Sequence, residues 1–134
     1  MLPAEPAQPA APAIRVLVVD DAGDLRALLK LVLEFDAEFT VVGEAANGEE
    51  AIRLSAELQP DLVVLDIAMP VMDGMDALQQ LHAVAPNTKV VMYSAYDSGW
   101  LAERAHGLGA AAYIDKTAGV VDLVGRLRSI CQPA

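Results

Sequence analysis

The sequence predicts an α/β fold in which five parallel strands alternate with helices. Five short aliphatic or β-branched runs carry this prediction: Ile14–Val19, Phe39–Val42, Leu62–Leu65, Lys89–Tyr93 and Ala111–Ile114. Their apolar character is continuous rather than alternating, which is typical of strands buried on both faces of a parallel sheet. The runs begin roughly 20–27 residues apart, the length of one strand and one crossover helix. Right-handed crossovers place helices on both faces, and a doubly wound (βα)5 sheet best fits the strand order 2-1-3-4-5.

Ahead of the first run, prolines recur every third residue, with alanines between them: Pro3, Pro6, Pro9 and Pro12. A three-residue period suits polyproline II, which has three residues per turn. We therefore expect residues 1–13 to form an extended or disordered tail, and residues 14–134 to form one domain.

The first crossover segment carries apolar residues with helical spacing, namely Leu25, Leu28, Leu29 and Val32. Asp24 precedes this stripe and is of a residue type that caps helix N-termini. We expect the first helix to be capped by Asp24 and to pack on the sheet through the stripe.

Two later stripes predict further helices. The first comprises Ala51, Leu54, Ser55 and Leu58, and the second comprises Val120, Leu123, Val124, Leu127 and Cys131. Asn47 followed by Glu50 resembles a capping box ahead of the first of these stripes. Pro60 and Pro86 mark the points where helices stop before the third and fourth strands.

The composition indicates a soluble, acidic protein of one domain. The chain has 134 residues, a formal net charge of −10 and a single cysteine, so it has no intrachain disulfide framework. No apolar run approaches the roughly 18 residues of a membrane helix, and the start lacks the pattern of a secretory signal. The strong negative charge argues against nucleic-acid binding through the general electrostatic attraction. We expect a cytoplasmic protein with no direct nucleic-acid or membrane partner.

Polar residues stand at the carboxyl ends of four predicted strands: Asp20 and Asp21, then Asp66, then Ser94, then Asp115 and Lys116. Strands one and three are neighbours in the expected order, so their three carboxylates converge in the crevice where such sheets bind ligands. Two unit charges about 4 Å apart repel by about 4 kcal/mol at an effective dielectric near 20, so the cluster needs protons or a cation. A small set of hard oxygen ligands favours Mg²⁺, and the ammonium of Lys116 would pair with a phosphoryl group.

Spaced motifs identify a family that the chain resembles. These are the pair Asp20-Asp21 after an aliphatic run, Asp66 with the following Met69-Pro70 and Asp73-Gly74, Ser94-Ala95, and Tyr113 three residues before Lys116. With them the chain, over about residues 14–131, resembles a receiver domain of the bacterial two-component response regulators. The resemblance implies a flavodoxin-like fold. Because this family is itself a standard example of the 2-1-3-4-5 order, that order is not an independent prediction.

The resemblance implies a role for each matching residue. Asp66 would accept a phosphoryl group from a phosphohistidine on a sensor histidine kinase or a phosphotransfer protein. Asp21, Asp66 and the backbone carbonyl of Ala68 would bind Mg²⁺ directly, and Asp20 would bind it through water. Lys116 and the hydroxyl of Ser94 would contact the phosphoryl group. On phosphorylation Ser94 and Tyr113 would move and reshape the face formed by the fourth helix, fifth strand and fifth helix.

Three residues depart from the family pattern or vary within it. Many members have proline where Thr117 follows Lys116, and Lys-Thr favours the transcription-factor branch with a helix-turn-helix output. Ala68, two residues after Asp66, has no side-chain group to orient a water, so we expect it to give no help to self-dephosphorylation. Tyr96, two residues after Ser94, is bulky and near the site, and the sign of its effect on hydrolysis stays open.

The sequence thus favours a phosphorylation-activated switch that is no enzyme beyond its own phosphorylation and dephosphorylation. It leaves open a stand-alone receiver, the receiver part of a longer regulator, and a homodimer. A Mg²⁺-dependent phosphohydrolase with an aspartyl nucleophile is disfavoured, since such enzymes usually have a second aspartate at the position of Ala68. A receiver-like module that no longer takes phosphate is disfavoured because the acceptor set is intact.

Other conspicuous residues are expected to be structural. The glycines of Gly107–Gly109 precede a strand, so they predict a helix end and turn rather than a dinucleotide site. We expect His82 and His106 at the surface, Cys131 in packing, and Arg126 and Arg128 at a helix end. Trp100 is either an ordinary aromatic residue or part of the face formed by the fourth helix, fifth strand and fifth helix.

Overall fold

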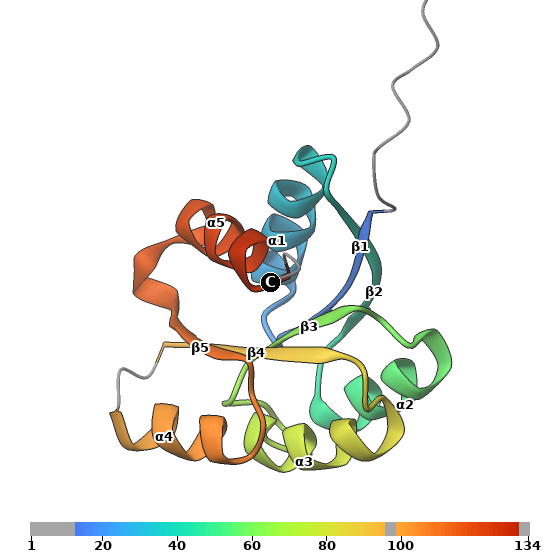
Figure 1. Cartoon of the computed structure of the whole chain (residues 1–134), viewed down its shortest axis with the longest axis vertical. Coiled ribbons are helices and arrows are strands. Elements are labelled where there is room, and N and C mark those ends of the chain that lie inside the picture. The colour runs from blue at the N-terminus through green and yellow to red at the C-terminus, as the bar shows by residue number, and fades with distance from the viewer. Residues whose placement is uncertain (1–12, 96–98, 132–134) are drawn as a thin grey trace, which may run out of the picture.

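In the computed structural model of the chain, residues 13–95 and 99–131 are described. They form one parallel sheet between two layers of helices (Figure 1). The strands are β1 (Ile14–Val19), β2 (Phe39–Ala45), β3 (Leu62–Leu65), β4 (Lys89–Ser94) and β5 (Ala112–Asp115). Their order in the sheet is β2-β1-β3-β4-β5, which confirms the predicted order. The expected tail of residues 1–13 lies almost entirely outside the described residues.

The helices are α1 (Gly23–Phe35), α2 (Gly48–Leu58), α3 (Gly74–Val84), α4 (Gly99–Gly107) and α5 (Val120–Cys131), and a 3₁₀ turn η1 spans Lys116–Ala118. Figure 1 shows α1 and α5 on one face of the sheet and α2, α3 and α4 on the other. Among the described residues no helix combines the length and apolar character needed to cross a membrane.

Alternate residues of each strand supply two separate cores, because successive side chains point to opposite faces of a sheet. On β1, Val16 and Val18 pack with α1 and α5, whereas Leu17 and Val19 pack with α2, α3 and α4. Val16–Val19 are all at most 1% exposed. The continuous apolar runs of the sequence therefore correspond to strands covered on both faces, as expected.

Strand and helix ends differ from the prediction by a few residues. β2 extends three residues beyond the predicted end to Ala45, β4 includes Ser94, and β5 is shifted by one residue to Ala112–Asp115. Proline positions matched the helix ends, since α2 ends before Pro60 and α3 before Pro86. The residues added to the strands are mostly polar or glycine, so a prediction based on apolar runs did not include them.

The predicted cap of the first helix was wrong. α1 begins at Gly23 with Ala22 as its N-cap residue, and Asp24 lies inside the first turn. The reason lies in Asp20, whose Oδ1 accepts the Ala22 N–H at 2.9 Å and thereby turns the chain earlier than expected. The predicted stripe was also partly wrong, because Leu28 is 43% exposed whereas Leu33 is fully buried.

The second predicted cap is confirmed. The side chain of Asn47 accepts the Glu50 N–H at 2.9 Å, and Glu50 Oε2 reaches back to the Ala46 N–H at 3.4 Å. Both remaining stripes are confirmed too. Ala51 and Ser55 of α2, and Leu123, Val124 and Leu127 of α5, are buried against the sheet. Cys131 packs against the core under α5, as expected.

The turn after α4 also matches its prediction. Gly109 has a positive φ of 100°, and its N–H and that of Ala110 close the helix end on His106 and Ala105. His106 is exposed, as expected. His82 is a partial correction to the expected surface position, since its Nε2 is buried and faces the backbone at Gly109.

Candidate functional site

The carboxyl ends of β1 and β3 lie side by side and place two aspartates next to each other. Val19 of β1 pairs with Leu65 of β3, and Asp20 and Asp66 follow these residues directly. The Asp66 N–H donates to the Val19 carbonyl at 3.0 Å, and the Asp20 N–H donates to the Ala45 carbonyl at 3.1 Å. The backbone ladder therefore continues through both aspartates, which fixes where their side chains start.

Three carboxylates converge at this edge. One oxygen each of Asp20, Asp21 and Asp66 lies within 4.8 Å of the others. Asp20 is 2% exposed and Asp66 is 5% exposed, whereas Asp21 is open to solvent. Two buried carboxylates beside an accessible third concentrate negative charge at a place that solvent, and hence a small cation, reaches at Asp21.

Lys116 reaches the same place from the end of β5. Its Nζ lies 2.7 Å from Asp20 Oδ2 and 3.4 Å from Asp66 Oδ1. Asp115, which the sequence placed beside it, caps η1 instead, with Oδ1 accepting the Thr117 N–H at 2.8 Å. This cap turns the chain sharply after β5 and directs Lys116 toward the carboxylates.

The charges of the cluster are not balanced. Burial, and next the charge of Asp20, raises the pKa of Asp66 above its usual value, although Lys116 offsets part of this. Burial disfavours the Lys116 ammonium, but its hydrogen bond to Asp20 and the charges of Asp66 and Asp20 outweigh burial and raise the pKa of Lys116. With one ammonium among three carboxylates, this oxygen-rich set fits a hard divalent cation such as Mg²⁺.

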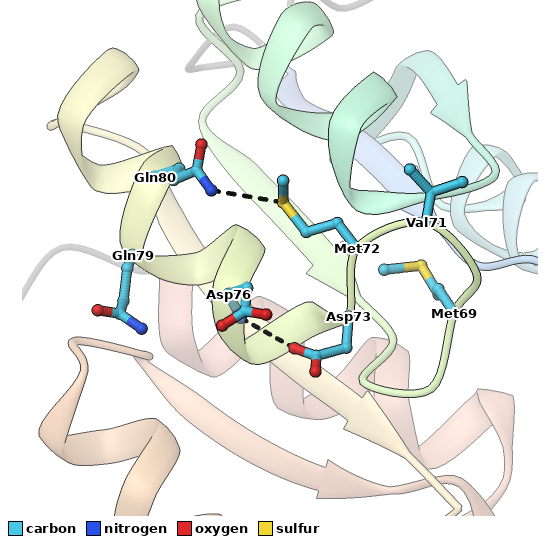
Figure 2. A pocket seen from close by; sticks show the side chains of 7 residues that line it. All are labelled: Met69, Val71, Met72, Asp73, Asp76, Gln79 and Gln80. Atoms are coloured by element: carbon cyan, nitrogen blue, oxygen red, sulfur yellow. Dashed lines mark hydrogen bonds between the residues drawn. The ribbon is translucent and has the colours of Figure 1, made fainter.

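The loop after β3 returns to the strand end that it left. The Gly74 N–H donates to the Ile67 carbonyl at 2.8 Å, and a Cβ at Gly74 would lie 2.1 Å from the Asp66 carbonyl oxygen. Asp73 caps α3 by accepting the Asp76 N–H at 3.0 Å (Figure 2). Ala68, on the same loop, is exposed.

A groove beside this loop is distinct from the acidic cluster. Figure 2 shows its lining residues, Met69, Val71, Met72, Asp73, Asp76, Gln79 and Gln80, around a cavity of about 590 Å³. Gln80 Nε2 points at the Met72 sulfur, 3.6 Å away. No carboxylate of the cluster lines the groove, so the two features need separate explanations.

The remaining predicted site residues lie on β4 and β5. Ser94 ends β4 and is fully buried, and Tyr113 of β5 is half-buried against the core under α4. Trp100, in the first turn of α4, is 68% exposed. Tyr96 lies outside the described residues.

Sequence reasoning missed Arg26 and Glu44. Arg26 Nη1 donates to the Asp20 carbonyl oxygen at 2.6 Å, and its Nε lies 3.4 Å from Glu44 Oε1. An arginine in the first two turns of a helix that follows an acidic pair was the available signal. Its partner Glu44 could not be found that way, because it comes from a strand end that the sequence did not predict.

Comparisons with known proteins agree with this geometry. Residues 16–128 match the family model described as the response regulator receiver domain. The chain is 43% identical over 103 residues to the chemotaxis protein CheY of Listeria monocytogenes, covering 77% of this chain and 86% of that one. It is also 43% identical over 111 residues to a protein-glutamate methylesterase/protein-glutamine glutaminase of Caldanaerobacter subterraneus, covering 82% of this chain.

The chain spans only 30% of the length of that methylesterase relative. Among solved structures, a CheX–CheY–BeF3–Mg²⁺ complex from Borrelia burgdorferi contains a chain with a TM-score of 0.84 at 30% identity, covering 90% of each chain. The similarity therefore extends over nearly all of the described fold.

Proposed function

The chain belongs to the response regulator receiver domain family of two-component systems, and from this premise we propose that Asp66 is its phospho-acceptor. The observation that carries the proposal is the meeting of Asp66, Asp20, Asp21 and Lys116 at one edge of the sheet. Asp66 is one of the two buried carboxylates of this group, and its Oδ1 lies 3.4 Å from the Lys116 ammonium.

In the proposed reaction a carboxylate oxygen of Asp66 attacks the phosphorus of a phosphohistidine on a histidine kinase or a phosphotransfer protein. The P–N bond breaks, its electron pair stays on the imidazole nitrogen, and that nitrogen takes up a proton. The product is an aspartyl phosphate. Lys116 holds a positive charge beside the transferred group, and the chain's main contribution is positioning and charge neutralisation.

Asp20, Asp21, Asp66 and the carbonyl of Ala68 are the residues that would hold Mg²⁺. When bound, the ion offsets the negative charge of the carboxylates and the incoming phosphoryl oxygens. Burial, and next the charge of Asp20, raises the pKa of Asp66, and the repulsion between these two buried carboxylates supports this assignment. The similarity to a chain of the CheX–CheY–BeF3–Mg²⁺ complex supports it as well.

Ser94 and Tyr113 are the proposed switch residues. Ser94 ends the strand next to β3, and Tyr113 lies on β5 beside it, so a new charge on Asp66 is sensed first along these two strands. Movement there alters the face formed by α4, β5 and α5, where Trp100 is exposed. This face is the proposed output surface.

The alternatives are less well supported. A phosphohydrolase of this type needs a second acid near Asp66, and Ala68 occupies that position. A silent module would not need a buried acceptor paired with Lys116. We expect no catalysis beyond the chain's own phosphorylation and dephosphorylation, and we place the chain in the cytoplasm, either alone or as the receiver part of a longer regulator. The mass of the native protein distinguishes these two forms.

Intact-mass measurement after incubation with acetyl phosphate tests the proposal. We expect a gain of one phosphoryl group that requires Mg²⁺ and is absent in Asp66→Asn. Asp76→Asn, which removes an exposed carboxylate of α3 outside the cluster, is the matched control and should gain the group normally. A gain in Asp66→Asn equal to that of the wild type would refute the assignment of Asp66.

A further inference from the structure

Arg26 links three elements at the border of the acidic site. It lies on α1, its Nη1 donates to the Asp20 carbonyl oxygen at 2.6 Å, and its Nε faces Glu44 of β2 at 3.4 Å. The side chain is 22% exposed, and the Nε atom itself is buried. A guanidinium that is largely covered is expected to stay in one place rather than sample many rotamers.

Arg26 supplies the last partner that Asp20 needs. The Asp20 N–H bonds to Ala45, its Oδ1 accepts from Ala22, and its Oδ2 accepts from Lys116. The remaining polar group, the carbonyl oxygen, is held by Arg26. The carbonyl of Asp20 and the N–H of Asp21 belong to one planar peptide unit. Arg26 therefore sets the orientation of the backbone that presents Asp21.

Asp21 has little else to orient it. It is exposed, and its side chain makes no hydrogen bond or ion pair recorded within residues 13–95 and 99–131. It is also the accessible member of the cluster, from whose side a cation would enter.

We propose that Arg26 is a positioning residue for a divalent cation, holding the Asp20–Asp21 peptide so that the Asp21 carboxylate faces Asp66. Glu44 lies beside the guanidinium as its ion-pair partner and offsets part of its charge. This inference rests on the proposed function in one respect, namely that the acidic cluster binds Mg²⁺.

Positioning and plain electrostatics give opposite results for the same substitution. A guanidinium close to a cation site repels the cation, so by charge alone its removal strengthens Mg²⁺ binding. If Arg26 acts by holding the peptide, its removal weakens Mg²⁺ binding although a positive charge is lost. Arg26→Met keeps an unbranched apolar stem and removes both the charge and the donor, so it separates the two explanations.

The experiment is a calorimetric titration of the full chain with Mg²⁺, with the Asp21 and Ala22 amide signals followed by NMR. We expect Arg26→Met to weaken Mg²⁺ binding by about tenfold, the scale of other residues that orient metal ligands. Arg26→Lys should recover part of the loss, since one ammonium can reach only one of the two partners. In Arg26→Met the amide signals of Asp21 and Ala22 should shift even without metal, because the Asp20 carbonyl loses its hydrogen bond from Arg26, and unchanged signals would contradict the positioning role.

Two further variants keep the test decisive. Glu44→Gln keeps the hydrogen bond of Arg26 to Asp20 and removes only the partner of its charge, so it should weaken Mg²⁺ binding less than Arg26→Met does. Arg53→Met removes an arginine from an ion pair on α2 and should leave binding within about twofold of wild type. Mg²⁺ binding by Arg26→Met that equals or exceeds wild type overturns the inference alone. Absence of Mg²⁺ binding by the wild type overturns the proposed metal site and the inference with it.

Discussion

Gly74 is where the loop after the acceptor strand comes closest to Asp66. A Cβ at this position would meet the Asp66 carbonyl oxygen at 2.1 Å and the Ile67 Cα at 2.8 Å. Since real Cβ atoms do not approach backbone this closely, only glycine lets α3 start against the strand end. The contact ties the position of α3 to that of Asp66, the proposed phospho-acceptor.

We predict that Gly74→Ala destabilises the fold by about 1–3 kcal/mol, the cost of forcing extra volume into a packed site. Urea unfolding measures the loss, and the rate of labelling by acetyl phosphate should fall as well. Gly125→Ala on α5 is the control. Nothing lies within 4 Å of a Cβ there, so alanine should stabilise the helix by about 0.5–1 kcal/mol. Equal stability of both variants would contradict the prediction.

Val71 adopts a backbone conformation that β-branched residues avoid. Its φ is 70°, and its side chain is 76% exposed. The left-handed region costs an L-residue about 1–2 kcal/mol, and exposed methyl groups recover little of that cost.

Replacing Val71 with asparagine, which tolerates this region, should raise the free energy of unfolding by about 1 kcal/mol. Thermal or urea unfolding measures the change. Val121→Asn, at an equally exposed valine within α5, should bring no such gain. A destabilised Val71→Asn would mean that the valine side chain makes a contribution that its exposure conceals.

Ala68 is expected to affect a kinetic property, the lifetime of the phosphorylated chain. It lies two residues after Asp66 and has no group that could orient a water for attack on an aspartyl phosphate. We predict that Ala68→Asn shortens the lifetime of the phosphorylated chain, measured as the decay of the mass-shifted species after the phosphodonor is removed. An unchanged decay rate would show that this position does not control hydrolysis.

At the scale of elements, α5 is fastened to the end of α1. Arg128 in the last turn of α5 pairs with Asp36, the C-cap residue of α1, and with Glu38 at 3.2 Å. The hydrogen bond that the Asp36 carboxylate accepts from the Glu38 N–H is the main cause that lowers the pKa of Asp36, and Arg128 adds to it. Arg128 therefore acts at a helix end, as the sequence predicted.

The lowered pKa of Asp36 predicts that the stability of the fold depends on pH. A carboxyl whose pKa is lowered by folding contributes stability above its unfolded value, near 3.8, and loses that contribution as the pH falls through the lower folded value. Asp36→Asn should therefore be less stable than wild type at neutral pH, and the difference should shrink below pH 3.8 and vanish only once the pH lies below the lowered folded pKa of Asp36. Urea midpoints across pH measure this. A difference that persists in strong acid would assign the effect to something other than the carboxylate charge.

Helix α1 also shows that apolar spacing along the sequence does not always predict which face of a helix is buried. α1 carries apolar residues nearly all round, including Leu25, Leu28, Leu31, Val32 and Leu33. Several stripes with helical spacing can be drawn through such a set, and only contact with the sheet decides which is buried. The structure buries Leu33 and leaves Leu28 and Leu31 exposed.

At the scale of the whole molecule, the parallel sheet collects charge at one edge. Asp20 and Asp66 are nearly fully buried there and share one ammonium. Their repulsion is a cost to the metal-free fold, and we infer that it is what a bound cation relieves. The arrangement at Asp66 that suits the proposed chemistry therefore lowers the stability of the metal-free fold.

Asp66→Asn should thus stabilise the metal-free chain, by about 1 kcal/mol after screening by Lys116 and solvent. The added stability that Mg²⁺ confers on the wild type should shrink or disappear in this variant. Thermal unfolding with Mg²⁺ and with a chelator measures both effects. Leu31→Ala, on the exposed face of α1, should keep the full Mg²⁺ effect. A destabilised metal-free Asp66→Asn would show that the carboxylate is favourably solvated as it stands.

The sequence by itself determined the fold class and most of the candidate site, whereas the strand order was not a prediction independent of the family resemblance. Continuous apolar runs can be buried only between two helical layers, and parallel strands bring their carboxyl ends to one edge. Asp20, Asp21, Asp66 and Lys116 could therefore be placed together from their positions at strand ends alone.

Only the tertiary structure decided the contacts between elements that no local pattern links. The hold of Arg26 on Asp20, the balance of its charge by Glu44, and the approach of Gly74 to Asp66 depend on how helices are seated on the sheet. The buried face of α1 and the cap at Ala22 were decided in the same way. Helix seating follows from packing and hydrogen bonding across the whole molecule, whereas spacing along the chain reports only which faces are able to pack.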